Sequence, residues 1–555
     1  MAMLRSPALA HALFCLLMGL RFGPDFLGSA RAEALGDGAD ARAAVTFRLP
    51  RFADPVAGSQ FSHRAGSNAA HGSGPVDLNG DGRPEIVQAY SNFPGLGPDR
   101  PEPIVLLGVS PSAFTYSEKT SAFLAGDVPK QVHSRVLEVR DFNDDGKLDY
   151  FLGGHGYDAD PFDGEPDWLI LSRTGQKHVG RSVPPKEDTY THAAASGDID
   201  RDGIDDIYVG VLCCSEQGPY FLLGRKEKMP VPSFNRLNAT VADRAETYTA
   251  AALVDVDGVK GPDLVLGAFQ APDSVVYLND GAGNFLSANP DLTLPTGLFG
   301  TGNSQTVDIL PVDVDTNGKP DLILSQTMND PFYEGYGLQV LVKKAGAGFD
   351  DQTSKRMRSG SGMDADGLWR AKLFAADFFG DGIVDFLSSR FCGGGLDDYV
   401  IWLNDGSGVF TPQKRRLIDK TDAAEDCNMI YPVDVDKDGR SDIARLVGVS
   451  GTSDRMLTYR NLGPAASGAA TVPEIVRQPK AVTVNPGDPM LLSVSARGTR
   501  PLKFQWFRNN KAIAGATGPV FQVAAAATGD GGRYKVRVKN AAGQVVSEVV
   551  KVSVN

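Results

Sequence analysis

The stretch Asp198-Ile-Asp-Arg-Asp-Gly-Ile-Asp-Asp206 decides the fold of this chain, because six other segments repeat its pattern. Carboxylate or amide side chains stand at positions 1, 3, 5 and 9, and a glycine at position 6 permits a sharp turn. Together with the carbonyl of position 7, these oxygens can converge on one cation. The seven segments begin at Asp77, Asp141, Asp198, Asp255, Asp313, Asp377 and Asp434.

The chemistry of these loops indicates calcium. Hard oxygen ligands in a flexible loop favour Ca²⁺ over Zn²⁺, and over Mg²⁺ where the protein supplies most of the ligands. An EF-hand would place a glutamate at position 12 on a following helix. Here that position holds residues such as Leu152 and Val209, which lie within apolar, β-rich runs. Each loop is therefore expected to join two strands.

The seven loops do not offer the same ligands. Five carry Asp or Asn at all of positions 1, 3 and 5, whereas Val259 replaces the ligand at position 5 of the fourth loop and Phe379 the one at position 3 of the sixth. We predict about five calcium sites, with the loops that begin at Asp255 and Asp377 weak or empty. The predicted metal ligands are Asp77, Asn79, Asp81, Glu85, Asp141, Asn143, Asp145, Asp149, Asp198, Asp200, Asp202, Asp206, Asp313, Asp315, Asn317, Asp321, Asp434, Asp436, Asp438 and Asp442.

The repeat period indicates a β-propeller. Successive loops begin 57 to 64 residues apart, which suits a blade of four short antiparallel strands. An apolar run precedes each loop, a second follows it, and a third comes after a variable stretch; residues 279–281 and 404–406 then add the hairpin signal Asn-Asp-Gly. The seventh repeat has only three strands, so we predict that Ala44–Leu49 supplies its outer strand and closes the ring.

These loops, their flanking strands and the Asn-Asp-Gly-x-Gly-x-Phe turns resemble those of FG-GAP/VCBS repeat proteins, the family whose propeller also forms the head of integrin α subunits. The resemblance covers about residues 33–463 and implies seven blades, with Ca²⁺ between the first and second strands. The fourth and sixth loops depart from the family pattern. Such propellers occur in adhesins, carbohydrate-binding proteins and a few polysaccharide-degrading enzymes, so the resemblance leaves the function open.

Residues 473–555 resemble an immunoglobulin-like domain of the I-set kind. Trp506 matches the buried tryptophan of that fold, and Asp530–Tyr534 matches its tyrosine corner. Val494 and Val536 stand where the inter-sheet cysteines would be, so apolar packing is expected in place of a disulfide. The uncharged stretch 464–472 is predicted to be a linker. The predicted fold class is all-β: a seven-bladed β-propeller at 33–463, followed by an immunoglobulin-like β-sandwich.

Charge divides the chain at the same boundary. The 555 residues carry a net charge of −13, yet residues 473–555 hold 12 Lys and Arg against four acidic residues. The acidic balance of the whole chain argues against a nucleic-acid partner, because such binding needs clustered Lys and Arg. The basic surplus of the C-terminal domain leaves four interpretations: it faces an acidic polymer, an acidic cell surface or the propeller, or it is a solvated face.

The N-terminal segment predicts export. Arg5 precedes the apolar run Ala8–Leu20, and Ala30-Arg31-Ala32 fits a cleavage site, so residues 1–32 are predicted to be a signal peptide. The run is too short to span a bilayer, and no membrane span is expected elsewhere. The mature protein is expected to be secreted, periplasmic or at the cell surface, in a compartment where disulfides persist.

Four of the five cysteines lie beyond the predicted signal peptide. Cys392 and Cys427 are expected on the face opposite the calcium loops, in neighbouring blades, and we predict a disulfide between them. For the adjacent Cys213 and Cys214, a vicinal disulfide and two thiols both remain open.

The face opposite the calcium loops is the candidate ligand face. Propellers bind ligands across one face, and aromatic, amide and charged side chains suit sugars, although the same residues can simply fill the funnel. His133 and His192 are candidates for an acid–base role, but no Ser/His/Asp order, HExxH, P-loop or GxSxG motif accompanies them. A polysaccharide-degrading enzyme would use these two histidines or Arg370. The residues expected there are His71, His133, His155, Tyr157, Asp158, His192, Tyr248, Gln305, Phe332, Tyr333, Trp369, Arg370 and Asn428.

The sequence thus predicts an exported calcium-binding propeller that acts as a binding or adhesion protein for an extracellular glycan or a cell-surface protein, with no assigned catalytic residue. The alternative is a secreted polysaccharide hydrolase or lyase that uses the opposite face. A third interpretation is a scaffold whose immunoglobulin-like domain docks a partner.

Overall fold

The protein is almost entirely β-structure in its described parts. The computed structural model describes residues 49–63, 68–92, 97, 99–158, 163–172, 177–183, 188–212, 218–233, 236–237, 248–259, 261–269, 271–358, 364–368, 372–389, 399–414, 417–418, 429–450, 452–464, 470–523 and 525–555. The α-helices of these residues, α2 (Thr120–Phe123) and α4 (Thr353–Arg356), are each a single turn. No helix of the described residues is long and apolar enough to cross a membrane.

Seven sheets follow one another along the chain, each with four or five strands, and all their strands pair antiparallel except for one parallel pair in the second sheet. In each sheet the first strand ends at one of the seven acidic loops and the second strand begins at position 9 of that loop, as predicted. The first sheet contains β5 (Gly74–Val76), β6 (Glu85–Gln88), β9 (Val105–Val109) and β10 (Tyr116–Glu118), and the second contains β13 (Ser134–Arg140), β14 (Asp149–Gly154), β15 (Trp168–Leu171), β16 (His178–Ser182) and β11 (Leu124–Ala125). The third contains β17 (Thr191–Gly197), β18 (Asp206–Val211), β19 (Tyr220–Leu223) and β20 (Val231–Ser233), the fourth contains β21 (Tyr248–Val254), β22 (Asp263–Ala268), β23 (Val275–Tyr277) and β24 (Leu292–Thr293), and the fifth contains β25 (Ser304–Val312), β26 (Asp321–Met328), β27 (Glu334–Lys343), β28 (Phe349–Asp351) and β29 (Asp364–Leu368). The sixth contains β30 (Lys372–Ala376), β31 (Asp385–Ser389), β32 (Tyr399–Asn404) and β33 (Phe410–Lys414), and the seventh contains β34 (Ile430–Val433), β35 (Asp442–Ser450), β36 (Ser453–Tyr459), β2 (Val56–Ala57) and β3 (Phe61–Ser62).

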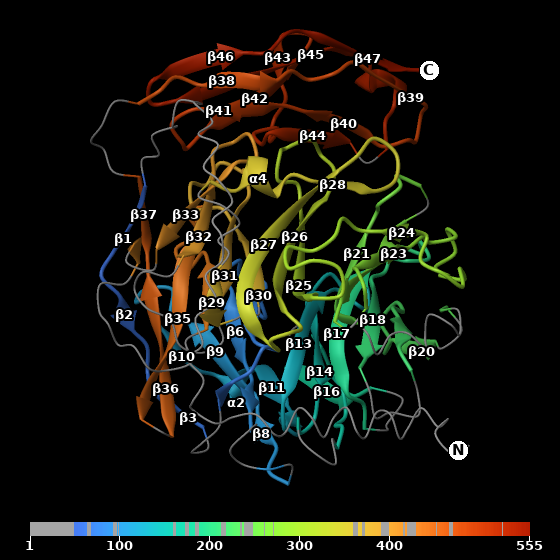
Figure 1. The fold of residues 1–555 in the computed structure, drawn as a ribbon. Helices are drawn as coiled ribbons and strands as arrows, with labels where there is room; N and C mark the ends of the chain where they lie inside the picture. Colours follow the sequence, from blue (N-terminus) through green and yellow to red (C-terminus); the bar gives the residue numbers. More distant parts are fainter. Residues whose placement is uncertain are drawn as a thin grey trace.

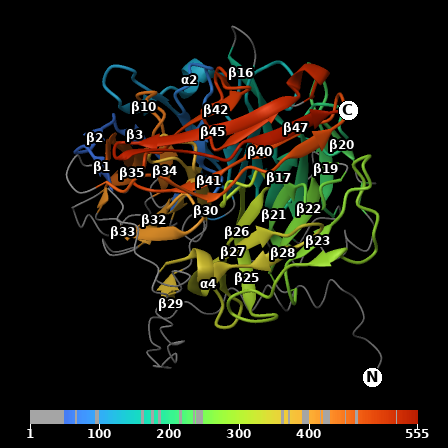
Figure 2. The same ribbon diagram turned by 90° about the horizontal axis from the view of Figure 1, so that it is seen from above.

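The seven sheets form a ring through their first strands (Figures 1 and 2). Strand β17 contacts β13 and β21, β25 contacts β21 and β30, and β34 contacts β30 and β5. The first and second sheets are joined by a hydrogen bond from Gly72 N to Ser134 O of 3.0 Å. A closed ring of seven four-stranded sheets is the arrangement of a seven-bladed β-propeller.

The ring is closed by an N-terminal segment, but not by the one predicted. Strands β2 and β3 pair with β36 as the outer edge of the seventh sheet, while β1 (Pro50–Phe52) pairs with β37 (Asn461–Pro464). Leu49 lies outside these strands, and residues 44–48 lie outside the described part of the chain. Ala44–Leu49 was predicted because it is a strand-like run upstream of the first repeat, whereas the observed edge consists of two short strands with Gly58 between them. A Cβ at Gly58 would clash with the carbonyl oxygens of Tyr116 and Met456.

The second strand of each blade is buried, which explains why it reads as a nearly continuous apolar run. All residues of β14, β18 and β22 are buried. Blades are also joined by the predicted Asn-Asp-Gly turns: Asn404 Nδ2 donates to Val314 O of the preceding blade at 2.9 Å and to Val384 O at 3.0 Å. Apolar packing and buried amide hydrogen bonds therefore stabilise the same ring.

The C-terminal domain is a two-layered sandwich with the predicted core. One layer contains β39 (Val482–Val484), β47 (Val550–Val554), β45 (Gly532–Asn540), β42 (Lys503–Arg508), β43 (Lys511–Ala512) and β46 (Gly543–Val546), and the other contains β38 (Glu474–Arg477), β41 (Ser495–Arg497), β40 (Met490–Ser493) and β44 (Val520–Val523). Val494, Trp506 and Val536 are fully buried in one cluster, so apolar packing does replace the disulfide. Tyr534 Oη donates to Asp530 O at 2.7 Å, which forms the tyrosine corner.

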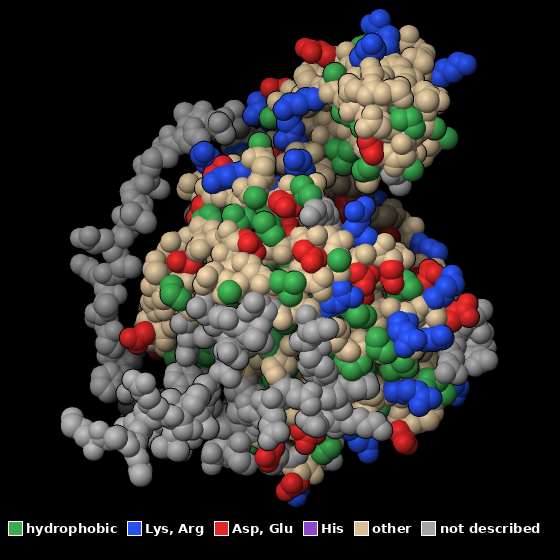
Figure 3. All heavy atoms as spheres, turned by 90° about the vertical axis from the view of Figure 1, so that its right-hand side faces the viewer, with side chains coloured by type: hydrophobic (Ala, Val, Ile, Leu, Met, Phe, Trp, Pro, Cys, Tyr) green, Lys and Arg blue, Asp and Glu red, His purple; other side chains and the backbone are tan. Residues whose placement is uncertain are grey.

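This domain sits on the end of the propeller that carries the acidic loops (Figures 1 and 3). Ser493 Oγ donates to Asn317 O at 3.3 Å and Ser495 Oγ to Gly406 O at 3.0 Å. The layer with β40 and β41 therefore faces the propeller, and the layer with β42 and β45 faces away. Strand β37 includes Pro464, the first residue of the predicted linker, and the other described residues of that linker, 470–472, contain no strand.

Candidate metal sites

The backbone of each loop is organised by the aspartate at position 1. In the second loop, Asp141 accepts hydrogen bonds from Asp145 N at 3.1 Å and from Gly146 N at 2.8 Å. Gly146 at position 6 has a φ of 81°, a conformation that residues with a Cβ rarely adopt. The carboxylate at position 1 thus folds the chain around itself and brings positions 3 and 5 to its side.

The carboxylate at position 9 ties the loop to the blade. Asp149 accepts a hydrogen bond from Phe142 N at 3.0 Å and another from Ser172 N, just after the third strand, at 2.7 Å. Burial raises the pKa of Asp149 to about 7. The same pair of backbone donors recurs on the position 9 aspartates of the third to seventh loops, Asp206, Asp263, Asp321, Asp385 and Asp442.

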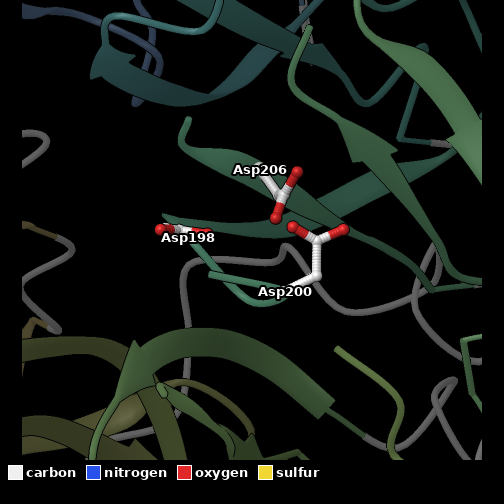
Figure 4. Close-up of side chains that lie close together, drawn as sticks. All are labelled: Asp198, Asp200 and Asp206. Carbon is white, nitrogen blue, oxygen red and sulfur yellow. The ribbon is translucent and has the colours of Figure 1, made fainter. Parts of the chain in front are cut away.

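Four loops gather three carboxylates into one cluster. In the third loop, Asp200 and Asp206 point toward one another with Asp198 beside them (Figure 4). In each cluster one oxygen from each side chain lies within 4.8 Å of the others. The first and second loops carry Asn at position 3 and do not form such a triad among the described residues. The triads are Asp198, Asp200 and Asp206; Asp255, Asp257 and Asp263; Asp313, Asp315 and Asp321; and Asp434, Asp436 and Asp442.

The burial and hydrogen bonding of the oxygen at position 3 indicate whether these residues fit a cation. In four of the five loops predicted to bind calcium, this oxygen is buried and accepts no hydrogen bond from the described residues. A buried carboxylate or amide oxygen without a partner is costly, and a bound cation would satisfy it. The four oxygens are Asn143 Oδ1, Asp200 Oδ1, Asp315 Oδ1 and Asp436 Oδ1. The donor set therefore fits an oxygen-coordinated cation such as Ca²⁺.

The first and fourth loops differ from those four. Asn79 Oδ1 accepts from Asp81 N at 2.7 Å, and its Nδ2 donates to Glu85 Oε1 at 2.9 Å. In the fourth loop, Asp257 Oδ1 accepts from Val259 N at 2.7 Å. The fourth loop brings its three carboxylates together despite Val259, so its predicted weakness rests on the missing ligand at position 5.

The sixth loop contains an arginine from the other domain. Arg500 of the immunoglobulin-like domain is fully buried, and its guanidinium lies 2.6 Å from Asp381 Oδ1 and 2.5 Å from Asp385 Oδ1. Its Nη2 lies 3.5 Å from Asp377 Oδ1 and donates to Ile383 O at 3.0 Å. These partners are positions 1, 5, 7 and 9 of the loop, the positions expected to coordinate a cation.

The residue that disqualified the sixth loop as a metal site completes the arginine site. Phe379, at position 3, lies under the guanidinium with 4.1 Å between the arginine Cζ and the ring centroid. Burial by itself would lower the pKa of Arg500, but Asp381 and Asp385 raise it above its ordinary value. The arginine is thus a charged side chain in the place that the repeat reserves for a cation.

The same domain also reaches the fifth loop. Arg477 Nη1 lies 3.3 Å from Asp315 Oδ2, and Arg356 of the propeller lies 3.2 Å from that oxygen. Thr316 Oγ1 donates to Val494 O at 3.0 Å. No sequence pattern indicates either interdomain arginine, since both lie more than 100 residues from their partners.

Comparisons with known proteins agree with the two halves of the structure. Residues 377–444 match the family model of the FG-GAP-like repeat, and residues 473–554 match the immunoglobulin I-set domain. The chain contains an FG-GAP-like repeat and an I-set domain. The I-set domain is also similar to titin domain M7, a solved structure, with 26% identity over 16% of this chain and 99% of that chain and a TM-score of 0.15.

Two curated proteins are similar to parts of the chain. Integrin alpha pat-2 of Caenorhabditis briggsae is 26% identical over 230 residues, which are 36% of this chain and 18% of that protein. Endoglucanase C of Cellulomonas fimi is 37% identical over 94 residues, 16% of this chain and 8% of that protein. The chain thus spans less than a fifth of the length of either relative.

The opposite side of the ring brings four predicted histidines together. The ring centroids of His71 and His133 are 6.1 Å apart, and His155 lies 5.1 Å from both His133 and His192. All four side chains are buried. Tyr190, which the sequence analysis did not single out, lies 3.9 Å from His155 and donates to Asp158 at 2.8 Å. Cys213, Cys214, Trp369, Arg370, Cys392, Cys427 and Asn428 lie outside the described residues.

The other residues predicted for that side differ in their burial and packing. Tyr248 and Gln305 are buried within first strands, whereas Phe332 is 43% exposed and packs against Tyr333 and Phe269. A cavity of about 120 Å³ lies between the first strands, lined by His71, His192 and the charged residues Arg135, Glu138, Asp308 and Lys372. These four charged residues were not predicted from the sequence, because an isolated charged residue in an apolar run is typical of a position that faces solvent.

We expect the histidine cluster to make stability fall in mild acid. Burial is the main cause that lowers the pKa of His133 well below its ordinary value, so the folded state keeps it neutral while the unfolded chain takes up a proton below about pH 6.5. Neither ring nitrogen of His133 has a hydrogen-bond partner among the described residues, so phenylalanine can replace it without an orphaned partner.

The variant His133→Phe should therefore flatten the dependence of unfolding free energy on pH below 6.5 by about 1 kcal/mol per pH unit. Urea unfolding at fixed Ca²⁺ between pH 7.5 and 5 measures this. Burial raises the pKa of nearby Glu165 to about 7, which lowers stability as pH rises in both proteins and cancels in the difference. Equal slopes for the two proteins would show that His133 is protonated in the folded state.

Proposed function

We propose that the chain is an extracellular binding protein whose propeller is stabilised by calcium and whose ligand is a glycan or a cell-surface protein. One observation carries the proposal: in four loops, at the end of the ring where the second domain docks, the position 3 oxygen is buried and has no hydrogen-bond partner among the described residues. Similarity to an integrin α subunit and to an I-set domain supports an extracellular setting and a binding role. The predicted export signal agrees with it.

The proposed calcium ligands are those predicted for the first, second, third, fifth and seventh loops, with the fourth loop weak and the sixth closed by Arg500. Bound Ca²⁺ would neutralise carboxylates that otherwise repel one another. The side chains at positions 1 and 9 are already held by backbone N–H groups, so the chain supplies a loop that is largely formed before the ion arrives. The role proposed for the metal is structural.

A second candidate function is cleavage of a polysaccharide at the histidine side of the ring. The cluster of His133, His155 and His192 beside Tyr190 favours it, because buried neutral imidazoles and a phenol can exchange protons. Against it stands the burial of these histidines, since the neighbouring cavity of about 120 Å³ is lined by His192 but, among the described residues, not by His133, His155 or Tyr190. The binding role is therefore the one we favour.

One assay separates the two functions. The full chain is incubated with a panel of immobilised polysaccharides and cell envelopes, with Ca²⁺ or with EDTA, and both bound protein and soluble oligosaccharides are measured. We expect retention on at least one member of the panel, its loss in EDTA as the propeller unfolds, and no soluble product. Product release that disappears in a folded His192→Gln variant would overturn the binding role in favour of catalysis.

A further inference from the structure

The outer layer of the immunoglobulin-like domain presents one broad cationic face, which we call the β42–β45–β47 face. In strand β45, alternate residues point outward: Arg533, Lys535, Arg537 and Lys539 are exposed or half-buried, while Tyr534, Val536 and Val538 are buried. Register adds cations on both sides, because Lys503 of β42 pairs with Lys539 and Lys551 of β47 pairs with Arg533. The outward positions of β42, β45 and β47 contain no acidic residue.

The charges of these cations are not neutralised by ion pairs with the residues that the structure describes. None of the six forms an ion pair within the described part of the chain. The other four arginines of the domain are all paired, Arg477 with Asp315, Arg497 with Glu474, Arg500 with the sixth loop and Arg508 with Asp530, whereas Lys480 and Lys511 have no ion pair among the described residues. The paired arginines thus either dock the domain on the propeller or form ion pairs within the domain, whereas the cations of the β42–β45–β47 face stay available to a ligand.

The geometry of the row matches a linear polyanion. Four cations at alternate positions of one strand extend about 20 Å at the usual rise per residue. The layer faces away from the propeller, so the acidic loops lie on the other side of the domain (Figures 1 and 3). A chain of regularly spaced negative groups could therefore lie along β45 without approaching the acidic loops.

The face suits an acidic polysaccharide better than a nucleic acid. Single-stranded nucleic acids need open aromatic rings on which bases stack, and duplexes are read by elements that enter a groove. The aromatic side chain of this face, Phe507, is already engaged by Arg537 at 5.3 Å and by Lys535 at 6.0 Å. A flat sheet with cations and the exposed amide side chain of Gln544 instead offers charge and hydrogen bonds to carboxylate or sulfate groups and hydroxyls.

We propose that the β42–β45–β47 face binds a linear acidic polysaccharide. This inference rests on the proposed function, because it names the ligand class of the binding protein and assigns the ligand to the second domain rather than to the propeller. The propeller and its loops then hold the domain in place, while the outward sheet of the domain contacts the polysaccharide.

The test compares two triple variants of the full chain that remove the same charge from different surfaces. One is Lys535→Gln/Arg537→Gln/Lys539→Gln on the face; the control is Lys130→Gln/Lys228→Gln/Lys355→Gln on exposed positions of the propeller. Dissociation constants are measured for polygalacturonate, heparin, neutral galactomannan, duplex DNA and phosphatidylserine vesicles at 50 and 300 mM NaCl.

We expect the wild type to bind polygalacturonate or heparin, to lose at least tenfold affinity at the higher salt, and to ignore galactomannan. The face variant should weaken that binding by about 30-fold, roughly threefold for each cation, and the control by less than threefold. Equal binding by the face variant and the wild type would overturn the assignment of the face, and tighter binding to DNA or vesicles than to both polysaccharides would overturn the ligand class. Either result leaves the proposed binding function standing; that function falls if the panel assay finds product release or no retained ligand.

Discussion

Replacing Arg500 by alanine is expected to destabilise the protein and to release the immunoglobulin-like domain from the propeller. The guanidinium is fully buried against Asp377, Asp381 and Asp385, and its loss leaves three neighbouring carboxylates without a counter-charge. Removal of one partner from a buried ion pair costs about 3–5 kcal/mol, because the remaining charge stays desolvated. Backbone contacts such as Leu502 N to Asp381 Oδ2, 2.9 Å, should be lost with it.

Chemical denaturation measures the loss of stability, and small-angle X-ray scattering measures undocking as an increase in the radius of gyration. Arg497→Ala is the matched control, since Arg497 pairs with exposed Glu474 on the same domain and should cost less than about 1 kcal/mol. Arg500→Lys should recover only part of the loss, because an ammonium group cannot reach four loop positions as the planar guanidinium does. An Arg500→Ala protein with wild-type stability and dimensions would show that the contact contributes nothing to docking.

Removal of calcium is expected to destabilise the propeller by more than any single substitution on its surface. Each ion that binds only the folded state contributes about 2.7 kcal/mol when free Ca²⁺ is a hundred times the dissociation constant, and about five loops are proposed to bind. Without the ions, carboxylates such as Asp198, Asp200 and Asp206 lie within 4.8 Å of one another and repel.

Thermal unfolding in 1 mM Ca²⁺ and in EDTA measures this contribution as a difference in midpoint. We expect Asp200→Ala and Asp436→Ala each to reduce that difference, because each removes a buried position 3 oxygen that has no other partner among the described residues. Asp257→Ala in the fourth loop should change it less, since the Asp257 oxygen already accepts a hydrogen bond from Val259 N. A midpoint that is the same in Ca²⁺ and EDTA would contradict the structural role of the metal.

The sequence predicted the parts of the molecule that depend on local pattern. The acidic loops recur at a near-constant period, and each fixes the end of one strand and the start of the next, so blade number and strand order followed from spacing. The sandwich core followed from the positions of Trp506, Val494 and Val536. In these cases the residues that decide the structure lie within one repeat or one domain.

The parts that the sequence did not predict depend on contacts between distant residues. Phe379 was interpreted only as a lost ligand, because nothing in the sequence near the sixth loop indicates that Arg500 lies over that ring. The closing strand was predicted at Ala44–Leu49, because the observed outer edge of the seventh sheet consists of two very short strands, interrupted at Gly58, which no sequence pattern marks. The cationic surplus of the second domain is evident from its composition. Only the register of β42, β45 and β47 distinguishes the arginines that dock the domain from the unpaired cations of the outward face.

The most direct measurement is a crystal structure grown with Ca²⁺ and recorded at a wavelength that gives an anomalous signal for calcium. We expect anomalous peaks in the first, second, third, fifth and seventh loops, and Arg500 with no peak in the sixth. Peaks absent from the second, third, fifth and seventh loops, where the orphaned oxygens lie, or a calcium peak in the sixth loop with Arg500 displaced, would contradict the division of the repeats into metal sites and an arginine site.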